Sequence, residues 1–255
     1  MPAGDDQLTR GPPPRATIAL KRAFDVAGSA LGLVLLLPLL IAVAVMIKLD
    51  SRGPVFFRQE RVGQGDRPFR IFKFRTMGVA ATQAGTALTV HADKRITRVG
   101  AVLRRSKIDE LPQLMNVLAG DMSLVGPRPE VPEFMNFYAP EQRSILVSMR
   151  PGMTDYAAIL FRDESSLLDQ DSDPVEVYRH EIMPIKFVHY ERYSREIGVL
   201  NDFRIILATI LLLVVGRVPR RFGIEHELQA ARRTREVTTS GEATTTRTKR
   251  SEQFG

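Results

Sequence analysis

Two adjacent carboxylates, Asp109 and Glu110, are the residues of this 255-residue sequence best suited to chemistry. They precede Leu111-Pro112, and proline is tolerated only in the first turn of a helix, so we expect both acids at a helix start. Acids at a helix start often do no more than cap it and complement its dipole. A functional role therefore needs support from neighbouring residues.

Cations stand close to this acid pair in the sequence. Arg104, Arg105 and Lys107 come just before it. Such neighbours suit an anionic ligand, or a carboxylate whose pKa is lowered.

A further arginine, Arg128, lies between Pro127 and Pro129. Because proline fixes the backbone φ angle, this guanidinium is presented in a nearly preset direction. Bidentate recognition of a phosphate needs that geometry, whereas a plain surface loop does not. We therefore predict that Arg128 binds an anion.

The segment Phe69–Arg75 alternates apolar and basic residues. An earlier aromatic run begins after Gly53-Pro54, and Gly63-Gln64-Gly65 separates the two runs. This pattern predicts a β-hairpin. Its basic residues, Arg70, Lys73 and Arg75, do not all share one face. From the residues alone, a solvated basic strand face explains them best.

The composition limits the chemistry. With no cysteine and four scattered histidines, the chain is not expected to bind zinc, and a disulfide-stapled secreted fold and a cysteine nucleophile are excluded. Two adjacent carboxylates suit Mg²⁺, which commonly takes one or two of them and completes its shell with water and substrate phosphates. The net charge of +7 favours anionic partners without choosing among nucleic acid, acidic lipids and phosphorylated substrates.

The strongest pattern outside these residues is Val26–Ile47, a run of 22 residues without a charge, which is long enough to cross a bilayer. A secretory signal peptide would have a shorter apolar core followed by a small-residue cleavage site. A spanning helix fits by length, but Pro38 would kink or break it, and equally basic flanks give no orientation. We therefore predict a re-entrant helix hairpin with both flanks on the cytoplasmic face, which Ser29 helps to hold together.

A second apolar stretch, Phe203–Val215, is too short to span a membrane comfortably. It predicts either a buried core helix or an interfacial helix on the bilayer. In the second case the basic residues that follow would meet acidic head groups; they are Arg217, Arg220 and Arg221.

The chain divides into four predicted segments. Residues 1–16 and 224–255 have the composition of disordered tails, and the second tail is mildly basic. Residues 17–50 form the predicted re-entrant membrane helix, and residues 51–223 the catalytic domain.

Taken in order, these motifs resemble the bacterial sugar transferase family, the monotopic phosphoglycosyl transferases that start glycan assembly on polyprenyl phosphate. The resemblance runs from about Lys21 to Val215, most of the chain between the tails. It rests on these stretches: Lys21-Arg-Ala-Phe-Asp25, Gly53-Pro-Val-Phe-Phe57, Lys73-Phe-Arg-Thr-Met77, Lys107-Ile-Asp-Glu-Leu-Pro-Gln-Leu114, Gly120-Asp-Met-Ser-Leu-Val-Gly-Pro-Arg-Pro129 and Arg150-Pro-Gly-Met-Thr154.

The resemblance implies an α+β, mainly helical fold with a small β-hairpin, a re-entrant helix broken at Pro38, and interfacial amphipathic helices. It places the protein on the cytoplasmic face of the bacterial inner membrane. It implies that Asp109 attacks the sugar-linked phosphate of a UDP-sugar, that UMP leaves, and that the aspartyl phosphosugar passes to undecaprenyl phosphate. Such a transfer starts the assembly of exopolysaccharide, capsule, O-antigen or glycoprotein glycans, and downstream glycosyltransferases are further expected partners.

The resemblance also implies roles for single residues. Asp109 and Glu110 would hold Mg²⁺, and Glu110 could accept a proton from polyprenyl phosphate. Asp202 matches a further family acid whose role stays open. The residues expected to bind substrate are Lys73, Arg75, Arg104, Pro127, Arg128, Pro129 and Arg162.

One stretch departs from the family pattern. The common Pro-Gly-Ile-Thr-Gly reads Pro151-Gly-Met-Thr-Asp155 here, which leaves the identity of the sugar open, and Ser165–Pro174 reads as an acidic insert.

Two alternatives to an active transferase stand. A membrane-anchored basic scaffold or nucleic-acid binder is disfavoured because the basic residues lack interleaved aromatics and no helix-turn-helix pattern occurs. A catalytically inactive homologue is disfavoured by the intact Asp109-Glu110 pair.

Overall fold

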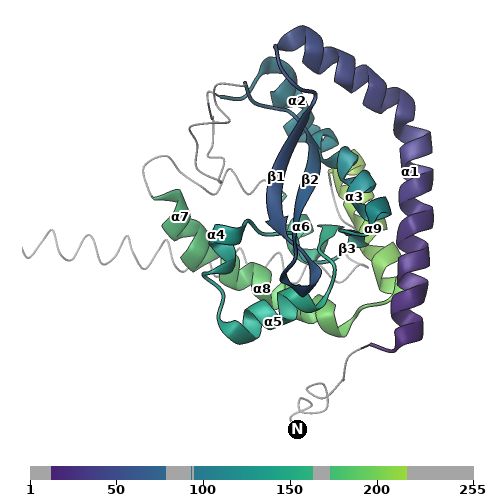
Figure 1. The fold of residues 1–255 in the computed structure, drawn as a ribbon, viewed down its shortest axis with the longest axis vertical. Coiled ribbons are helices and arrows are strands. Elements are labelled where there is room, and N and C mark those ends of the chain that lie inside the picture. Colours follow the sequence, from purple (N-terminus) through teal and green to yellow (C-terminus); the bar gives the residue numbers. More distant parts are fainter. Residues whose placement is uncertain (1–12, 79–92, 94, 163–172, 217–255) are drawn as a thin grey trace, which may run out of the picture.

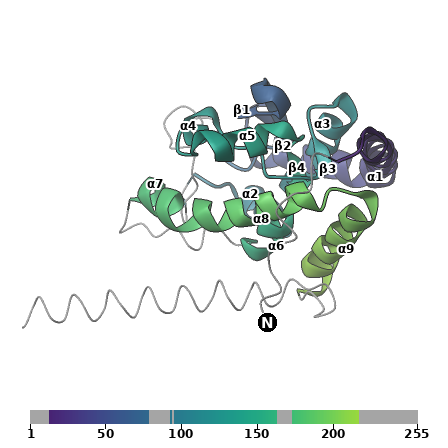
Figure 2. The same cartoon turned by 90° about the horizontal axis from the view of Figure 1, so that it is seen from below.

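A computed structural model of the chain describes residues 13–78, 93, 95–162 and 173–216. Nearly all of both predicted tails, most of the acidic insert and the three arginines at 217, 220 and 221 lie outside the described residues. Figures 1 and 2 show a mainly helical molecule with two small sheets.

The described elements follow one another in this order: α1 (Arg15–Asp50), β1 (Phe56–Val62), the 3-10 helix η1 (Gln64–Asp66), β2 (Pro68–Phe74), α2 (Arg98–Ser106), the 3-10 helix η3 (Ile108–Gln113), α3 (Leu114–Ala119), β3 (Ser123–Val125), α4 (Pro132–Met135), α5 (Pro140–Ser148), β4 (Gly152–Thr154), α6 (Tyr156–Leu160), α7 (Pro174–Val177), the π-helical turn η5 (Tyr178–Ile182), α8 (Met183–Arg195) and α9 (Val199–Val215).

The apolar run forms one continuous helix, α1, with Pro38 inside it. Figure 1 shows this helix bending in its second half and does not show two helices separated by a break. Proline removes a single backbone hydrogen bond and crowds the preceding turn, while the bonds on either side persist, so the helix bends and continues. Within the described residues, α1 is the one helix long and apolar enough to cross a membrane.

Most of α1 is exposed, and its few buried positions mark where it contacts the rest of the protein. Val43 and Ile47 pack against Phe74 and Leu103. In the first half of the helix the buried residues are polar: Lys21, Asp25 and Ser29. The hydroxyl of Ser29 donates to the Val26 carbonyl of its own helix at 3.1 Å.

The predicted β-hairpin is confirmed. Strands β1 and β2 pair antiparallel, with Phe57 opposite Lys73 and Val62 opposite Pro68, and η1 lies in the connection between them. One end of the hairpin packs on η3, which brings Lys73 to the acid pair.

A second sheet, which the sequence patterns did not predict, consists of two three-residue parallel strands, β3 and β4. Two glycines allow it to form, because a Cβ on Gly152 would lie 2.0 Å from the backbone nitrogen of Gly126. The carboxyl ends of parallel strands meet at one edge of a sheet. The segments that begin at Gly126 and Asp155 therefore start side by side.

Helix α9 is apolar on two faces. Ile205 and Ala208 pack in a core cluster with Tyr193 and Val125. Its other face is exposed and carries large apolar side chains: Leu200, Phe203, Leu207, Ile210 and Val214. The interpretation as a buried core helix holds for the first face, and the interpretation as an interfacial helix stays a prediction.

Helix α2 approaches the end of β2 closely, and this approach can be tested. The Thr97 amide donates to the Thr76 carbonyl at 3.0 Å, and a Cβ on Gly100 would lie 2.1 Å from that same carbonyl oxygen. Alanine favours a helix over glycine by about 1 kcal/mol, yet we expect Gly100→Ala to destabilise the protein by about 2–3 kcal/mol through overpacking.

Thermal unfolding of the detergent-purified protein measures this effect. Gly78→Ala is the control, because nothing lies within 4 Å of a Cβ built there. Equal or greater stability of the Gly100→Ala variant would show that α2 does not approach the strand this closely.

Candidate active site

The acid pair lies in the first turn of η3, as predicted. Lys107 adopts a left-handed conformation, with φ of 59°, and so turns the chain sharply between α2 and η3. The side chain of Asp109 is 94% buried, and its Oδ1 atom has no hydrogen-bond partner among the described residues. Lys107 holds the N-cap position of η3 and no side chain makes a capping hydrogen bond there, so capping does not explain Asp109.

Glu110 is clamped by two cations. Lys73 Nζ lies 2.9 Å from Glu110 Oε1, and the guanidinium of Arg128 donates to both carboxylate oxygens, at 2.7 Å and 3.1 Å. This is a bidentate pair, the stronger form of charge-assisted hydrogen bond. Arg128 thus makes a forked contact with a carboxylate, and its predicted binding of a phosphate stays a prediction.

The two acids have opposite pKa shifts. Burial raises the pKa of Asp109, and the adjacent charge of Glu110 adds to this effect, while Lys73 and Arg104 oppose it. Burial alone would also raise the pKa of Glu110, but the charges of Arg128 and Lys73 outweigh it and hold that pKa well below its usual value. The predicted lowering of a carboxylate pKa holds for Glu110 and is wrong for Asp109, because at Asp109 the effect of burial outweighs the neighbouring cations.

Lys73 itself is only partly exposed, so the interpretation as a solvated basic strand face fails there. Burial lowers the pKa of its amine. Arg70 on the same strand is exposed, as that interpretation expects.

The sequence patterns missed one cation of this site, Arg61 on β1. Its guanidinium donates to the Pro129 carbonyl at 3.1 Å, and it lies close enough to Arg128 for that charge to lower its own pKa, after the larger effect of burial. Arg61 therefore helps to hold the loop that presents Arg128. The only available signal was a basic residue near the hairpin turn, which is common in exposed hairpins.

Three residues predicted for the site contact other parts of the protein. Arg75 is buried and donates to the carbonyls of Ser51 and Arg52, just after α1. Arg162 donates to the Leu212 carbonyl of α9 at 2.8 Å. Asp202 lies fully buried in α9.

Asp155 is a buried carboxylate that the sequence analysis noted only as a departure from the family pattern. Its Oδ1 accepts from the Ala158 amide at 2.7 Å and so caps α6, while its Oδ2 has no hydrogen-bond partner among the described residues. Burial raises its pKa to about 6, against the charges of Lys186 and Arg128.

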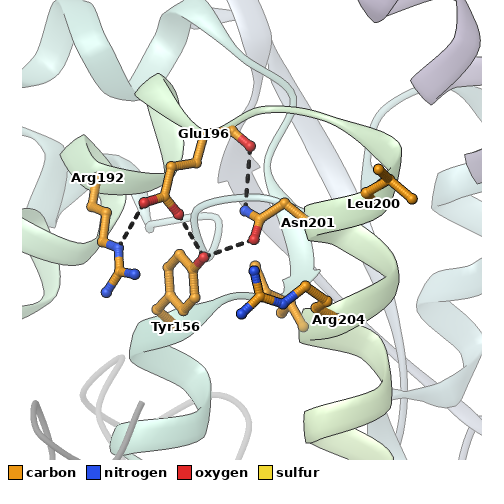
Figure 3. Close-up of a pocket in the computed structure, with 7 residues that line it drawn as sticks. Tyr156, Arg192, Glu196, Leu200, Asn201 and Arg204 are labelled. Atoms are coloured by element: carbon orange, nitrogen blue, oxygen red, sulfur yellow. Dashed lines mark hydrogen bonds and ion pairs between the residues drawn. The ribbon is translucent and has the colours of Figure 1, made fainter. Parts of the chain in front are cut away.

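A cavity of about 320 Å³ lies elsewhere, between α6, α8 and α9, where Tyr156 is hydrogen-bonded to Glu196 and Asn201 (Figure 3). None of the acid pair or its cations lines it.

The donor set at the acid pair fits Mg²⁺. No group of three or more Asp, Glu or His residues that could hold a metal occurs in the described part of the chain. A magnesium ion needs only one or two carboxylates when water and phosphate oxygens complete its shell. The unpaired oxygen of Asp109, with Glu110 next to it, meets that requirement.

Comparison with known proteins places this geometry in context. A family model described as "Bacterial sugar transferase" matches residues 16–216. A UDP-N-acetylgalactosamine-undecaprenyl-phosphate N-acetylgalactosaminephosphotransferase of Aeromonas hydrophila is 38% identical over 199 residues, which is 77% of this chain and 44% of that protein.

Two further relatives are named UDP-glucose:undecaprenyl-phosphate glucose-1-phosphate transferase. The one from Caulobacter vibrioides is 46% identical over 152 residues, 58% of this chain and 57% of that protein. The one from Escherichia coli strain K12 is 37% identical over 194 residues, 75% of this chain and 39% of that protein. The match to these three relatives thus spans between 39% and 57% of their length.

The raised pKa of Asp155 predicts a pH-dependent stability. An acid that is easier to protonate when folded stabilises the fold fully below pH ~4, and this contribution is lost as the pH rises through about 6. The full loss corresponds to about 3 kcal/mol at neutral pH. Asparagine keeps the cap and stays neutral, so we expect Asp155→Asn to be more stable than wild type at pH 7.5, with the difference shrinking between pH 6 and pH 4.

Thermal unfolding in detergent across this pH range is the measurement. Asp173→Asn is the matched control, because Asp173 caps α7 through the Val175 amide but is exposed. A stability difference between Asp155→Asn and wild type that does not change with pH would contradict the raised pKa of Asp155.

Proposed function

The chain belongs to the bacterial sugar transferase family, and from this premise we propose that it transfers a hexose 1-phosphate from a UDP-sugar to undecaprenyl phosphate, releasing UMP. The observation that carries the proposal is the pairing of a buried Asp109 that has an unpartnered oxygen with a Glu110 clamped by two cations. The names of the relatives support undecaprenyl phosphate as the acceptor, and two of them name a UDP-glucose donor.

In the first half-reaction, an Asp109 carboxylate oxygen attacks the sugar-linked phosphorus of the donor. The new bond joins that oxygen to phosphorus, the bond from phosphorus to the bridging oxygen breaks, and its electron pair leaves with UMP. Burial keeps water away from the nucleophile and from the acyl phosphate that it forms.

The cations of the site bind the donor phosphates. Arg128 and Lys73 both contact Glu110, and the diphosphate would compete with Glu110 for these cations. Arg104, whose charge acts on Asp109, adds a third cation near the nucleophile. Neutralising the phosphates in this way offsets the repulsion between two anions.

In the second half-reaction, a phosphate oxygen of undecaprenyl phosphate attacks the same phosphorus and Asp109 leaves as a carboxylate. Glu110 accepts the proton of the acceptor phosphate. Its low pKa depends on the clamp, so transfer of Arg128 and Lys73 to substrate phosphates raises that pKa and makes Glu110 a better base. A Mg²⁺ ion held by Asp109 and Glu110 would supply further charge neutralisation at the phosphates when bound.

The exposed apolar faces of α1 and α9 support a seat on the membrane, where the acceptor lipid resides. We propose that α1 enters the bilayer and returns, so that the domain from residue 51 onward rests on the cytoplasmic face of the bacterial inner membrane. The lipid-linked product would then pass to glycosyltransferases that extend the glycan.

Release of UMP tests the activity. We expect detergent-purified protein with Mg²⁺ and undecaprenyl phosphate to release UMP from at least one of UDP-glucose and UDP-N-acetylgalactosamine, and EDTA to stop the release. Asp109→Asn should lower the rate by at least about 1,000-fold, as loss of a nucleophile does.

Asp66→Asn is the control, since Asp66 is exposed and paired only with Arg143 among the described residues. No release by wild type from a broad panel of UDP-sugars would favour the scaffold or inactive-homologue alternatives.

The seat on the membrane predicts a labelling pattern. Because the chain has no cysteine, single cysteines introduced at exposed Arg15, Arg52 and Arg67 report the side of each position. In membrane vesicles, a maleimide that cannot cross the bilayer should label all three from the cytoplasmic side. Labelling of the Arg15→Cys variant from the opposite side would indicate a spanning α1.

A further inference from the structure

A cluster of buried polar side chains lies where α1, α8, α9 and β3 meet. Lys21 Nζ donates to Asp202 Oδ2 at 2.5 Å and to the Val125 carbonyl at 3.0 Å. The Tyr193 hydroxyl lies 2.8 Å from Asp202 Oδ1 and 3.0 Å from the same carbonyl. A side chain from α1 and one from α8 thus converge on one carbonyl of β3, and both contact Asp202 of α9.

Strand β3 is held along its whole length by α1. Asp25 Oδ1 accepts from the Leu124 amide at 3.0 Å, and its Oδ2 accepts from the Ser123 hydroxyl at 2.8 Å. The Ser123 hydroxyl also lies 2.9 Å from the Val125 carbonyl.

Stability alone does not account for this cluster. Asp202 is 0% and Asp25 1% exposed, and removing such charges from water costs several kcal/mol per ion, so well-packed apolar residues would stabilise the fold at least as well. Buried polar networks instead fix one arrangement of the groups that they join. The group fixed here is the carbonyl of the last residue of β3.

The chain leads directly from that carbonyl to the site. Gly126, Pro127 and Arg128 follow Val125, and the two ends of the turn are held by β4, with the Gly126 amide 3.0 Å from the Thr154 carbonyl and the Gly152 amide 2.8 Å from the Pro127 carbonyl. Proline at 127 and 129 fixes φ on both sides of Arg128. A segment this constrained transmits a shift of Val125 to the guanidinium, which clamps Glu110.

We propose that the cluster of Lys21, Asp202 and Tyr193 positions Arg128, so that this arginine has its working geometry only when α1 and α9 are packed together on β3. The expected effect on turnover rests on the proposed function, in which Arg128 binds the donor phosphates. It assigns Asp202 and Lys21 as positioning residues that touch neither substrate nor the reacting atoms.

Two tyrosines give a matched pair of variants. Tyr193→Phe removes the hydroxyl that contacts the Val125 carbonyl and Asp202. Tyr156→Phe removes a hydroxyl that also makes two hydrogen bonds, to Glu196 and to Asn201, the residue next to Asp202 on α9 (Figure 3). Only the first of these hydroxyls contacts β3.

The readout is the KM for the UDP-sugar. Unfolding of part of the sample lowers kcat and leaves KM unchanged, whereas a misplaced phosphate-binding arginine raises KM. We expect Tyr193→Phe to raise it about 5-fold, the effect of losing one hydrogen bond, and Tyr156→Phe to leave it within about 2-fold. In an Arg128→Ala background, Tyr193→Phe should raise KM no further, because the residue that it positions is gone.

Backbone hydrogen exchange tests the positioning without turnover. The Gly126 and Gly152 amides, which hydrogen-bond at the two ends of the turn, should exchange about 10-fold faster in Tyr193→Phe than in wild type, and at the wild-type rate in Tyr156→Phe. If wild type releases no UMP, the proposed function fails and this measurement alone decides the positioning role.

The proposal is overturned by unchanged exchange at Gly126 and Gly152 in Tyr193→Phe, by an unchanged KM, or by the same rise in KM with and without Arg128. Should Tyr193→Phe not fold, Ser123→Ala removes another hydroxyl that contacts the same carbonyl. Ser148→Ala is its control, since that hydroxyl donates to the Ile145 carbonyl of its own helix. The same outcomes then apply to that pair.

Discussion

Two carboxylates that are adjacent in the chain and buried together cannot both be ionised at neutral pH unless cations compensate them. The structure places two cations, Lys73 and Arg128, in contact with Glu110. Glu110 therefore keeps its charge and its low pKa, while Asp109 is left with a raised pKa and an oxygen that no described residue binds. Glu110 is thus the acid whose charge is compensated, and Asp109 is the acid left to react with the substrate, as the proposed nucleophile requires.

The residues of this site come from elements that lie far apart in the chain. Strand β2 brings Lys73, the turn after β3 brings Arg128, and η3 brings the acids. None of these elements is long, and β3 has only three residues. Strand β3 packs against both α1 and α9, the two helices with exposed apolar faces. In the proposed seating on a membrane, these helices therefore connect the bilayer to the site.

Local patterns predicted the local features. The hairpin follows from alternation and glycines, and the acid pair at a helix start follows from Pro112. The uncharged run predicts a helix, but the expected break at Pro38 is absent and α1 continues through it. The parallel pair β3–β4 could not be predicted, because three-residue strands carry no periodicity and depend on the approach of Gly126 to Gly152. The same limit applies to single side chains. Nothing in the sequence near Arg75 indicates that it binds the carbonyls that follow α1, and the partners of Asp202 lie far away in the chain, at Lys21 and Val125.

The most direct test of the central claim is the mass of the quenched enzyme. Protein mixed with its UDP-sugar donor without acceptor lipid, then quenched, digested and analysed by mass spectrometry, should carry one hexose phosphate on the peptide that contains Asp109. The adduct should disappear when undecaprenyl phosphate is added before quenching. Turnover of the same sample with no adduct on Asp109, or an adduct on another residue, would contradict the account.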